Sequence, residues 1–177
     1  MLQVRAARHE DIAGIIKICE ENLLTNHQKN MTNEEIVKSG FLMSKLESDY
    51  AKNMIDDEEN FIFLVAEEAG EILGYLTACD ISKVAADFQK EIIEAEHKFV
   101  YYKQIAKRPG IKGLGTELFL GLLAEAKRRN YTAILCKIVH EPIYNQASIA
   151  FHEKNGFKEI RKAQEKNRLV GVYLRAL

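Results

Sequence analysis

Hydrophobic residues recur at two different spacings along the chain, and the N-terminal third already shows both. Residues 2–7, LQVRAA, alternate apolar and polar positions, which predicts a half-buried strand. Residues 9–24 place apolar side chains three or four positions apart, as on one face of a helix. The more polar segment 32–57 predicts two short helices that separate near Gly40.

The middle of the chain predicts a hairpin, then a helix and a strand. Two β-rich runs within 61–79 meet around Ala69 and Gly70, a dipeptide suited to a tight turn. Apolar residues at helical spacing predict a helix over 82–98, and the run 99–106 predicts a strand.

The C-terminal part begins with a leucine-rich stripe that predicts a helix over 114–130. This helix ends in basic residues and at Asn130, a residue that tolerates the left-handed conformation. The remaining elements are a buried strand, a short capped helix and a final pair of strands, over 131–139, 145–156, 157–160 and 169–177.

Composition and charge narrow the class of protein. The 177 residues and the alternation of strands and helices predict a single α+β domain over 1–177, with a mixed sheet flanked by helices. A net charge of -1 gives no general basic surplus for nucleic acid. Without a signal peptide or a span of about 18 apolar residues, we expect a cytoplasmic protein with no membrane partner. Cys19, Cys79 and Cys136 lie far apart in apolar runs, which predicts free thiols and no metal site.

The stretch KRPGIKGLGTEL, residues 107–118, lies between a predicted strand and a predicted helix. Its glycines permit positive φ and a close approach of a ligand to the backbone. The first N–H groups of a helix lack intrahelical partners and suit a phosphate, although a plain turn also explains these residues. The stretch lacks the Gly-Lys-Ser/Thr ending of a nucleotide P-loop. It also lacks a dinucleotide fingerprint, because Gly110, Gly113 and Gly115 have the reverse spacing.

The segment QIAKRPGIKGLGTELFLGLLAEAKRR resembles the acyl-CoA-binding motif of the GNAT superfamily of N-acetyltransferases. There, a strand precedes a Gln/Arg-x-x-Gly-x-Gly/Ala turn and a helix; Gly113 and Gly115 match the small positions, and Gly110 replaces the usual Gln or Arg. The segment NQASIAFHEKNGF resembles the second family motif. Because both motifs occur in family order, the resemblance covers almost the whole chain. The matching residues of the second motif are Asn145, Ser148, Gly156 and Phe157.

The resemblance implies a GNAT-like acyltransferase fold with a mostly antiparallel sheet, and acetyl-CoA as the acetyl donor. It implies that the pantetheine arm bonds to backbone groups where two strands separate, and that the diphosphate rests on the amides of the turn. The backbone N–H of Ile105 would polarise the thioester carbonyl. The residues implied to bind the cofactor are Ile105, Ala106, Lys107, Lys112, Gly113, Leu114, Gly115, Thr116 and Asn145.

Acetyl transfer to an amine needs a neutral nucleophile and a proton for the leaving thiolate. An alkylammonium of pKa near ~10.4 is neutral in only about one molecule in a thousand at pH 7, so a general base would help. His152 is the first candidate, as an acid, because the resemblance places it where many family members have Tyr. His140, beyond a predicted strand end, is the second, as a base. Further polar candidates are Gln104, Tyr101, Tyr102, Tyr144, His97 and Glu141.

The acceptor is less well defined, and His9 and His27 fit ordinary surface positions. Acidic residues in 24–60 and 80–98 suit a cationic amine, but a solvated helix face explains them better. The leading hypothesis is an N-acetyltransferase for a primary amine of a small molecule or a protein. A catalytically silent acyl-CoA-binding module and a nucleotide-binding regulatory domain are the alternatives. A homodimer is expected if the final strand leaves an apolar sheet edge.

Overall fold

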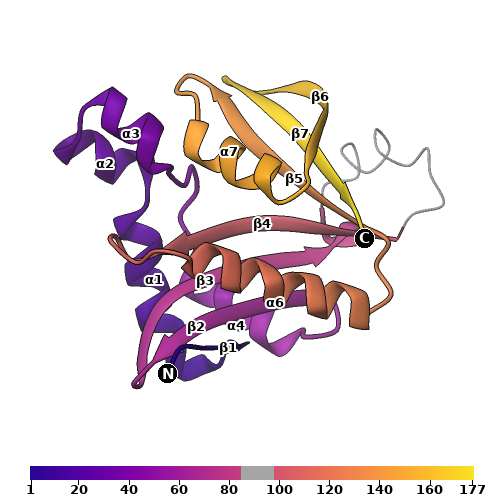
Figure 1. Cartoon of the computed structure of the whole chain (residues 1–177). Helices are drawn as coiled ribbons and strands as arrows, with labels where there is room; N and C mark the ends of the chain where they lie inside the picture. Colours follow the sequence, from indigo (N-terminus) through magenta and orange to yellow (C-terminus); the bar gives the residue numbers. More distant parts are fainter. Residues whose placement is uncertain (85–97) are drawn as a thin grey trace.

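The computed structural model describes residues 1–84 and 98–177, in which a seven-stranded mixed sheet forms the centre (Figure 1). The strand order is β1-β2-β3-β4-β5-β7-β6, with β4 and β5 parallel and the other neighbours antiparallel. This confirms the predicted α+β fold with a mostly antiparallel sheet. The strands are β1 (Gln3–Ala6), β2 (Phe61–Glu68), β3 (Glu71–Asp80), β4 (Phe99–Lys107), β5 (Ala133–Glu141), β6 (Lys158–Glu165) and β7 (Arg168–Ala176).

Helices cover both faces of this sheet (Figure 1). The helices α6 and α7 pack against one face, whereas α1 and α4 pack against the other. The helices are α1 (Ile12–Glu21), α2 (Leu24–Asn30), α3 (Asn33–Ser39), α4 (Ser48–Asp56), α6 (Leu114–Arg128) and α7 (Gln146–Lys154), with short 3-10 turns η1 (His9–Asp11) and η2 (Ile81–Lys83).

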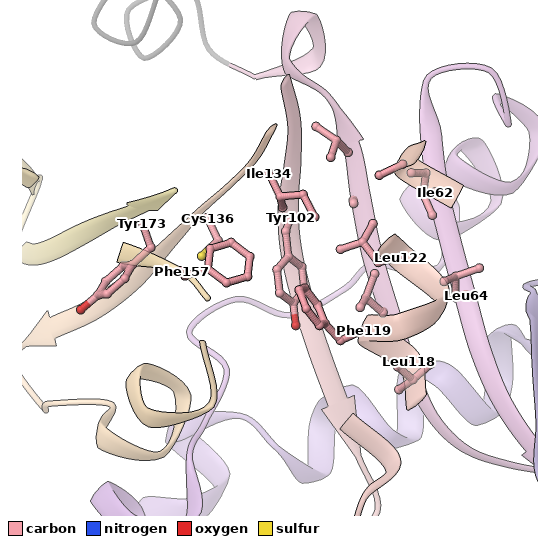
Figure 2. Packing of buried hydrophobic residues seen from close by; sticks show 14 of the residues in the cluster. Ile62, Leu64, Tyr102, Leu118, Phe119, Leu122, Ile134, Cys136, Phe157 and Tyr173 are labelled. Atoms are coloured by element: carbon pink, nitrogen blue, oxygen red, sulfur yellow. The ribbon is translucent and has the colours of Figure 1, made fainter. Parts of the chain in front are cut away.

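The helix α6 forms as its leucine spacing predicts. Leu114, Leu118 and Leu122 are buried against the sheet, and Figure 2 shows the last two beside Phe119 in this core. Burying a side chain of this size contributes about 1.5–3 kcal/mol, so the packing fixes the start of α6 close to β4. The helix stops as predicted, because Asn130 has a φ of 58° in the left-handed region.

Three segments differ from the sequence prediction or fall outside it. The helix α2 was not predicted, because its sequence LTNHQKN buries one apolar side chain, Leu24, and so has no amphipathic stripe. The strand β6 extends beyond the predicted 157–160 to Glu165. The helix predicted over 82–98 falls mainly on 85–97, which lie outside the described residues.

The edge of the sheet also differs from the prediction. Because β7 lies between β5 and β6, the apolar run 169–177 is interior, and the expected apolar edge for a dimer was wrong. The edge strand is β6, whose sequence KEIRKAQE exposes charged side chains, a pattern that discourages pairing between sheets. No helix within the described residues has the length and apolar character needed to span a membrane.

The parallel strands β4 and β5 are paired over only part of their length. Their register ends at Tyr102 and Cys136, although β4 continues to Lys107 and β5 to Glu141. A β-bulge marks the same point, because β4 pairs with β3 on both sides of Lys103 but not at that residue. Bulges bend a strand and redirect its side chains. Figure 1 shows the two strands diverging from this point, with α7 near the opening.

Candidate active site

A cleft of about 930 Å³ opens where β4 and β5 separate. The unpaired ends of both strands, the helix α7 and the segment 39–46 between α3 and α4 provide its walls. Volumes of roughly 300–1,000 Å³ are typical of sites that bind small molecules. The strand separation implied by the family resemblance is therefore present in this chain.

The free edge of β4 presents backbone groups to the cleft. The backbone N–H of Arg108 donates to the Leu73 carbonyl on β3 at 2.8 Å. In an antiparallel pair, the N–H groups of successive residues point alternately toward and away from the partner strand. The N–H groups of Ile105 and Lys107 therefore point away from β3, toward the opening. The Nδ2 of Asn22, at the C-terminal end of α1, donates a hydrogen bond to the Lys107 carbonyl at 3.0 Å. Together with Ala106, these β4 residues line the cleft. An extended ligand can bond to this edge as an added strand does.

The turn between β4 and α6 keeps backbone donors free for an anion. Gly110 and Gly113 have φ of 82° and 78°, in the left-handed region that favours glycine. A Cβ added at either position would meet no atom within 4 Å, so the outer side of the turn is open. The helical ladder starts where Thr116 and Glu117 donate to the Gly113 carbonyl, so the amides of 113–115 precede it. With the positive end of the α6 dipole, these amides fit a diphosphate.

The side chains around this turn have different roles. Leu114 is 1% exposed and packs α6 into the core. Gly115 lies against α7, because a Cβ added there would be 3.4 Å from the ring of Phe151. Arg108 is held by an ion pair with Glu71 on β3. The basic groups left beside the amides are Lys107, which lines the cleft, and the exposed Lys112, next to the exposed hydroxyl of Thr116.

His152 lies on α7, lines the cleft and is 4% exposed. Its Nδ1 is 2.6 Å from the Ser148 carbonyl, which can only accept, so Nδ1 carries the proton and Nε2 the lone pair. The ring packs against Tyr102 and Phe157, with centroids 5.2 and 5.1 Å away. This burial lowers the pKa of His152 to about 4. At neutral pH, His152 is thus a neutral acceptor at Nε2 and has no spare proton to donate.

The depressed pKa of His152 makes the stability of the fold depend on pH. The unfolded chain takes up a proton near pH 6.5, whereas the folded chain does so only near pH 4, so stability is lost as the pH falls through this window. The full loss is about 3 kcal/mol, since one pKa unit corresponds to about 1.4 kcal/mol. Urea unfolding at pH 7 and pH 4.5 measures most of this loss, since pH 4.5 still lies above the folded pKa of about 4.

The His152→Gln variant is the control for this pH effect, because the carboxylates that also titrate contribute to both proteins. We expect the variant to lose less stability than the parent between the two pH values. Equal losses in both proteins would contradict the assignment of a buried neutral imidazole at position 152.

The structure does not bring His140 into the cleft. It lies on β5 and is 9% exposed, and its Nε2 lies 3.2 Å from the hydroxyl of Tyr173 on β7. That hydroxyl donates to Glu159 at 3.1 Å, so the Nε2 of His140 is the donor in the first contact. Gly171 makes room for the ring, because a Cβ there would lie 2.6 Å from Nε2. The sequence located the end of the strand but not the face that His140 occupies.

Asn145 lines the cleft, but both polar atoms of its side chain form hydrogen bonds within the protein. The Nδ2 donates to the Phe41 carbonyl at 3.0 Å, and Oδ1 caps α7 by accepting the Ser148 N–H at 3.4 Å. The predicted helix cap is confirmed. These contacts tie the start of α7 to the segment between α3 and α4, so Asn145 shapes the wall of the cleft.

Tyr102 carries the least expected polar group of the site. It is 3% exposed and lines the cleft, and its hydroxyl is buried without a hydrogen-bond partner among the described residues. Burial raises the pKa of Tyr102 far above 10, so the hydroxyl keeps its proton. Figure 2 shows the hydroxyl directed along β4 toward the strand's C-terminal end. A buried donor of this kind costs about 1–3 kcal/mol unless a ligand or water satisfies it.

The other polar candidates divide between the cleft and the surface. Tyr101 and Gln104 line the cleft, and Gln104 bonds the Tyr75 hydroxyl and the Ser44 carbonyl at 3.0 and 2.8 Å. Tyr144 is 47% exposed. Glu141 is exposed on the strand end, and His97 lies outside the described residues.

His27 is a cleft residue that the sequence reasoning took for a surface position. It is half-buried and lines the cleft from α2. Its Nε2 is 3.0 Å from the Glu21 carbonyl and must donate, so Nδ1 holds the lone pair. That buried Nδ1 has no partner among the described residues. His27 therefore places a buried polar atom with no partner among the described residues in the wall of the cleft, and its polar sequence context gave no signal for this.

Comparison with solved structures shows that the chain shares its fold with other proteins. The chain is similar in fold to the PaiA N-acetyltransferase of Thermoplasma acidophilum in complex with coenzyme A, with a TM-score of 0.68, 15% identity, and coverage of 100% of this chain and 99% of that chain. The chain is also similar in fold to YncA, a putative acetyltransferase of Salmonella typhimurium with its cofactor acetyl-CoA. The TM-score is 0.69 and the identity 19%, and the match covers 100% of this chain and 94% of that chain. For the ribosomal-protein-alanine N-acetyltransferase of Brucella melitensis, the TM-score is 0.67 and the identity 18%, and the match covers 99% of each chain.

No protein with a curated description matches the chain. The model of the acetyltransferase (GNAT) family matches residues 30–157, which contain both sequence motifs and the cleft-forming strands. The chain therefore belongs to the GNAT family of acetyltransferases.

Proposed function

We propose that this chain is an acetyl-CoA-dependent N-acetyltransferase that acts on a primary amine. The observation that carries the proposal is the unpaired edge of β4, which leads directly into the open glycine turn at the start of α6. Those two features supply a strand-like track for the pantetheine arm and a set of amides for the diphosphate. The solved relatives with coenzyme A or acetyl-CoA support the same donor.

Bound acetyl-CoA would supply a thioester carbonyl, at which the neutral amine forms a C–N bond as the C–S bond breaks. The proton that the amine nitrogen loses would balance the charge of the leaving sulfur, which departs as the thiol of coenzyme A. In this chain, the N–H of Ile105 faces the opening and is the backbone donor for that carbonyl. The hydroxyl of Tyr102 is a second donor, which keeps its proton and stabilises developing charge through a hydrogen bond. His152 accepts at Nε2 and positions the ring of Tyr102 by packing against it.

A silent acyl-CoA-binding module is the second candidate, because the family's usual Tyr on α7 is a neutral, buried His152 here. Release of coenzyme A from acetyl-CoA, followed with a thiol reagent and a panel of primary amines, separates the two. Amine-dependent release is expected for the enzyme. Acetyl-CoA binding without release for any amine would support the module instead.

A further inference from the structure

We propose that Gln104 is a positioning residue that holds the backbone N–H of Ile105 and the wall segment, residues 39–46, at a fixed separation across the cleft. The inference rests on the acetyl transfer proposed above, and it names a residue that acts on that reaction through its neighbours. Its basis is a pair of hydrogen bonds at the side-chain amide of Gln104, which joins β4 to the wall segment.

The side-chain amide of Gln104 has one orientation that satisfies both of its neighbours. The Ser44 carbonyl lies 2.8 Å from Nε2 and can only accept, so the NH₂ group faces it. The Oε1 then accepts from the Tyr75 hydroxyl at 3.0 Å. Burial raises the pKa of Tyr75 well above its usual value, so this hydroxyl keeps its proton and remains a donor.

Tyr75 gives this amide a rigid support. It is fully buried in the core beneath α1 and α4, where its ring packs edge-to-face on Phe63 with centroids 6.2 Å apart. Gln104 lies opposite Thr77 in the pairing of β3 with β4, and Tyr75 is two residues away from Thr77 on β3. Long side chains bridge this diagonal spacing on one face of a sheet. The core therefore fixes one end of the bridge.

The other end of the bridge holds the middle of the wall segment, at Ser44. The N-terminal part of the segment is tied to α7, because Asn145 donates to the Phe41 carbonyl at 3.0 Å. At its C-terminal end, the N–H of Leu46 lies 3.3 Å from a cysteine sulfur of α1. Gln104 joins the part between these ties to β4, so the length of one glutamine side chain sets their separation.

The backbone of Gln104 carries the donor proposed for the thioester carbonyl. The N–H of Ile105 belongs to the peptide group that joins these two residues, and this group is planar. It follows the bulge at Lys103 and lies beyond the last parallel pair of β4 with β5, so β3 supports it without help from β5. Donors must be held within about 0.5 Å of their working geometry, commonly by hydrogen bonds of neighbouring side chains.

Loss of the bridge should therefore affect the reaction more than it affects cofactor binding. The Ile105 amide and the wall segment would both gain freedom, and a displacement of about 1 Å in a reacting pair can lower a rate about a hundredfold. The diphosphate turn follows β4 and contains neither Gln104 nor Ser44, so its free amides should stay in place.

The first variant is Gln104→Met, which removes both hydrogen bonds and keeps a side chain of similar length. We expect kcat/KM for amine-dependent thiol release to fall at least about tenfold, while the Kd for coenzyme A changes less than about twofold. Gln164→Met is the matched control, because it makes the same change at an exposed glutamine of β6 outside the cleft. It should behave like the parent protein.

The second variant is Tyr75→Phe, which tests whether Tyr75 acts through Gln104. Tyr75 does not line the cleft, so the change removes the support and leaves the contact with Ser44. We expect kcat/KM to fall about threefold, and the double variant to be as active as Gln104→Met alone, since both changes break one bridge. Effects that multiply in the double variant would contradict the bridge.

The third variant, Gln104→Glu, gives a signature in the pH profile. Its carboxylate can accept from Tyr75 but cannot donate to the Ser44 carbonyl, whereas the neutral acid can do both. Partial burial beside a carbonyl raises the pKa of this carboxyl group, so kcat/KM relative to the parent should rise as the pH falls from about 8 to about 5. The same ratio for Gln104→Met should stay constant.

Trypsin cleavage after Lys45, followed by mass spectrometry, measures the bridge without turnover. Lys45 is exposed and follows Ser44 in the wall segment. Cleavage requires local opening, so its rate should rise at least about fivefold in Gln104→Met and stay at the parental rate in Gln164→Met.

The outcomes separate this inference from the proposed function. A folded Gln104→Met protein with parental kcat/KM, or with equal losses of kcat/KM and coenzyme A affinity, would overturn the positioning role and leave the acetyltransferase intact. Unchanged cleavage after Lys45 would overturn the bridge whether or not an amine is acetylated. If Gln104→Met folds poorly, Tyr75→Phe and Gln104→Glu decide the same question. An absence of thiol release by the parent with every amine, while acetyl-CoA binds, would overturn the acetyltransferase itself.

Discussion

Replacing Gly113 by valine is expected to weaken coenzyme A binding about a hundredfold. The φ of 78° at this position is an outlier for a β-branched residue, so the turn must rearrange or bear strain of about 1–2 kcal/mol. Either response moves the amides that precede the α6 ladder, and each charge-assisted hydrogen bond to a phosphate contributes about 1.5–3 kcal/mol. Losing about 3 kcal/mol of such contacts corresponds to a factor of roughly one hundred in Kd, measured by calorimetry.

Gly70→Val is the matched control for this variant. Gly70 has a φ of 81° in the β2–β3 turn, and a Cβ there also meets nothing within 4 Å, so the two substitutions impose similar strain. Both should lower stability by a similar amount, while only Gly113→Val should lose affinity for coenzyme A. Equal affinities in the two variants would show that the α6 turn is not the diphosphate site.

Replacing Tyr102 by phenylalanine is expected to change activity and stability in opposite directions. The variant deletes a buried hydroxyl that has no partner among the described residues, so the free energy of unfolding should rise by about 1 kcal/mol. If this hydroxyl donates to the reacting group, kcat should fall about a hundredfold, the usual effect of removing one such donor. Urea unfolding and amine-dependent thiol release measure the two effects.

Tyr173→Phe is the control for Tyr102→Phe, because it makes the same chemical change in a residue that is also buried. The Tyr173 hydroxyl contacts His140 and donates to Glu159, outside the cleft, so its removal should lower stability and leave kcat unchanged. Unchanged turnover in Tyr102→Phe would show that this hydroxyl does not take part in the reaction. His152 would then be the remaining candidate among the polar groups of this cluster.

Much of the fold was predictable because the information for it is local. The leucine stripe of α6, the left-handed stop at Asn130 and the hairpin turn at Ala69 and Gly70 each depend on a few neighbouring residues, and each is present. The Asn145 cap is of the same kind. Spacing over one or two turns is sufficient for these features, since backbone geometry fixes which neighbours meet.

The candidate site was less predictable because it depends on the register between strands that are far apart in the sequence. The separation of β4 from β5 and the bulge at Lys103 are set by pairing across the sheet, and both decide which side chains enter the cleft. His140 shows the difficulty well: its place at a strand end was evident, but its position on the face with Tyr173 was not. The buried hydroxyl of Tyr102 is likewise visible only when the packing around it is known.

Amide hydrogen exchange, followed residue by residue by NMR with and without coenzyme A, tests the proposed cofactor site most directly. Coenzyme A should slow exchange at Ile105 and at residues 113–115, which present the free amides of the β4 edge and the α6 turn. Exchange at Gly70 should not change, because Gly70 does not line the cleft. Unchanged exchange at Ile105 and in the turn, with saturating coenzyme A present, would contradict the cofactor site and the acetyl transfer inferred from it.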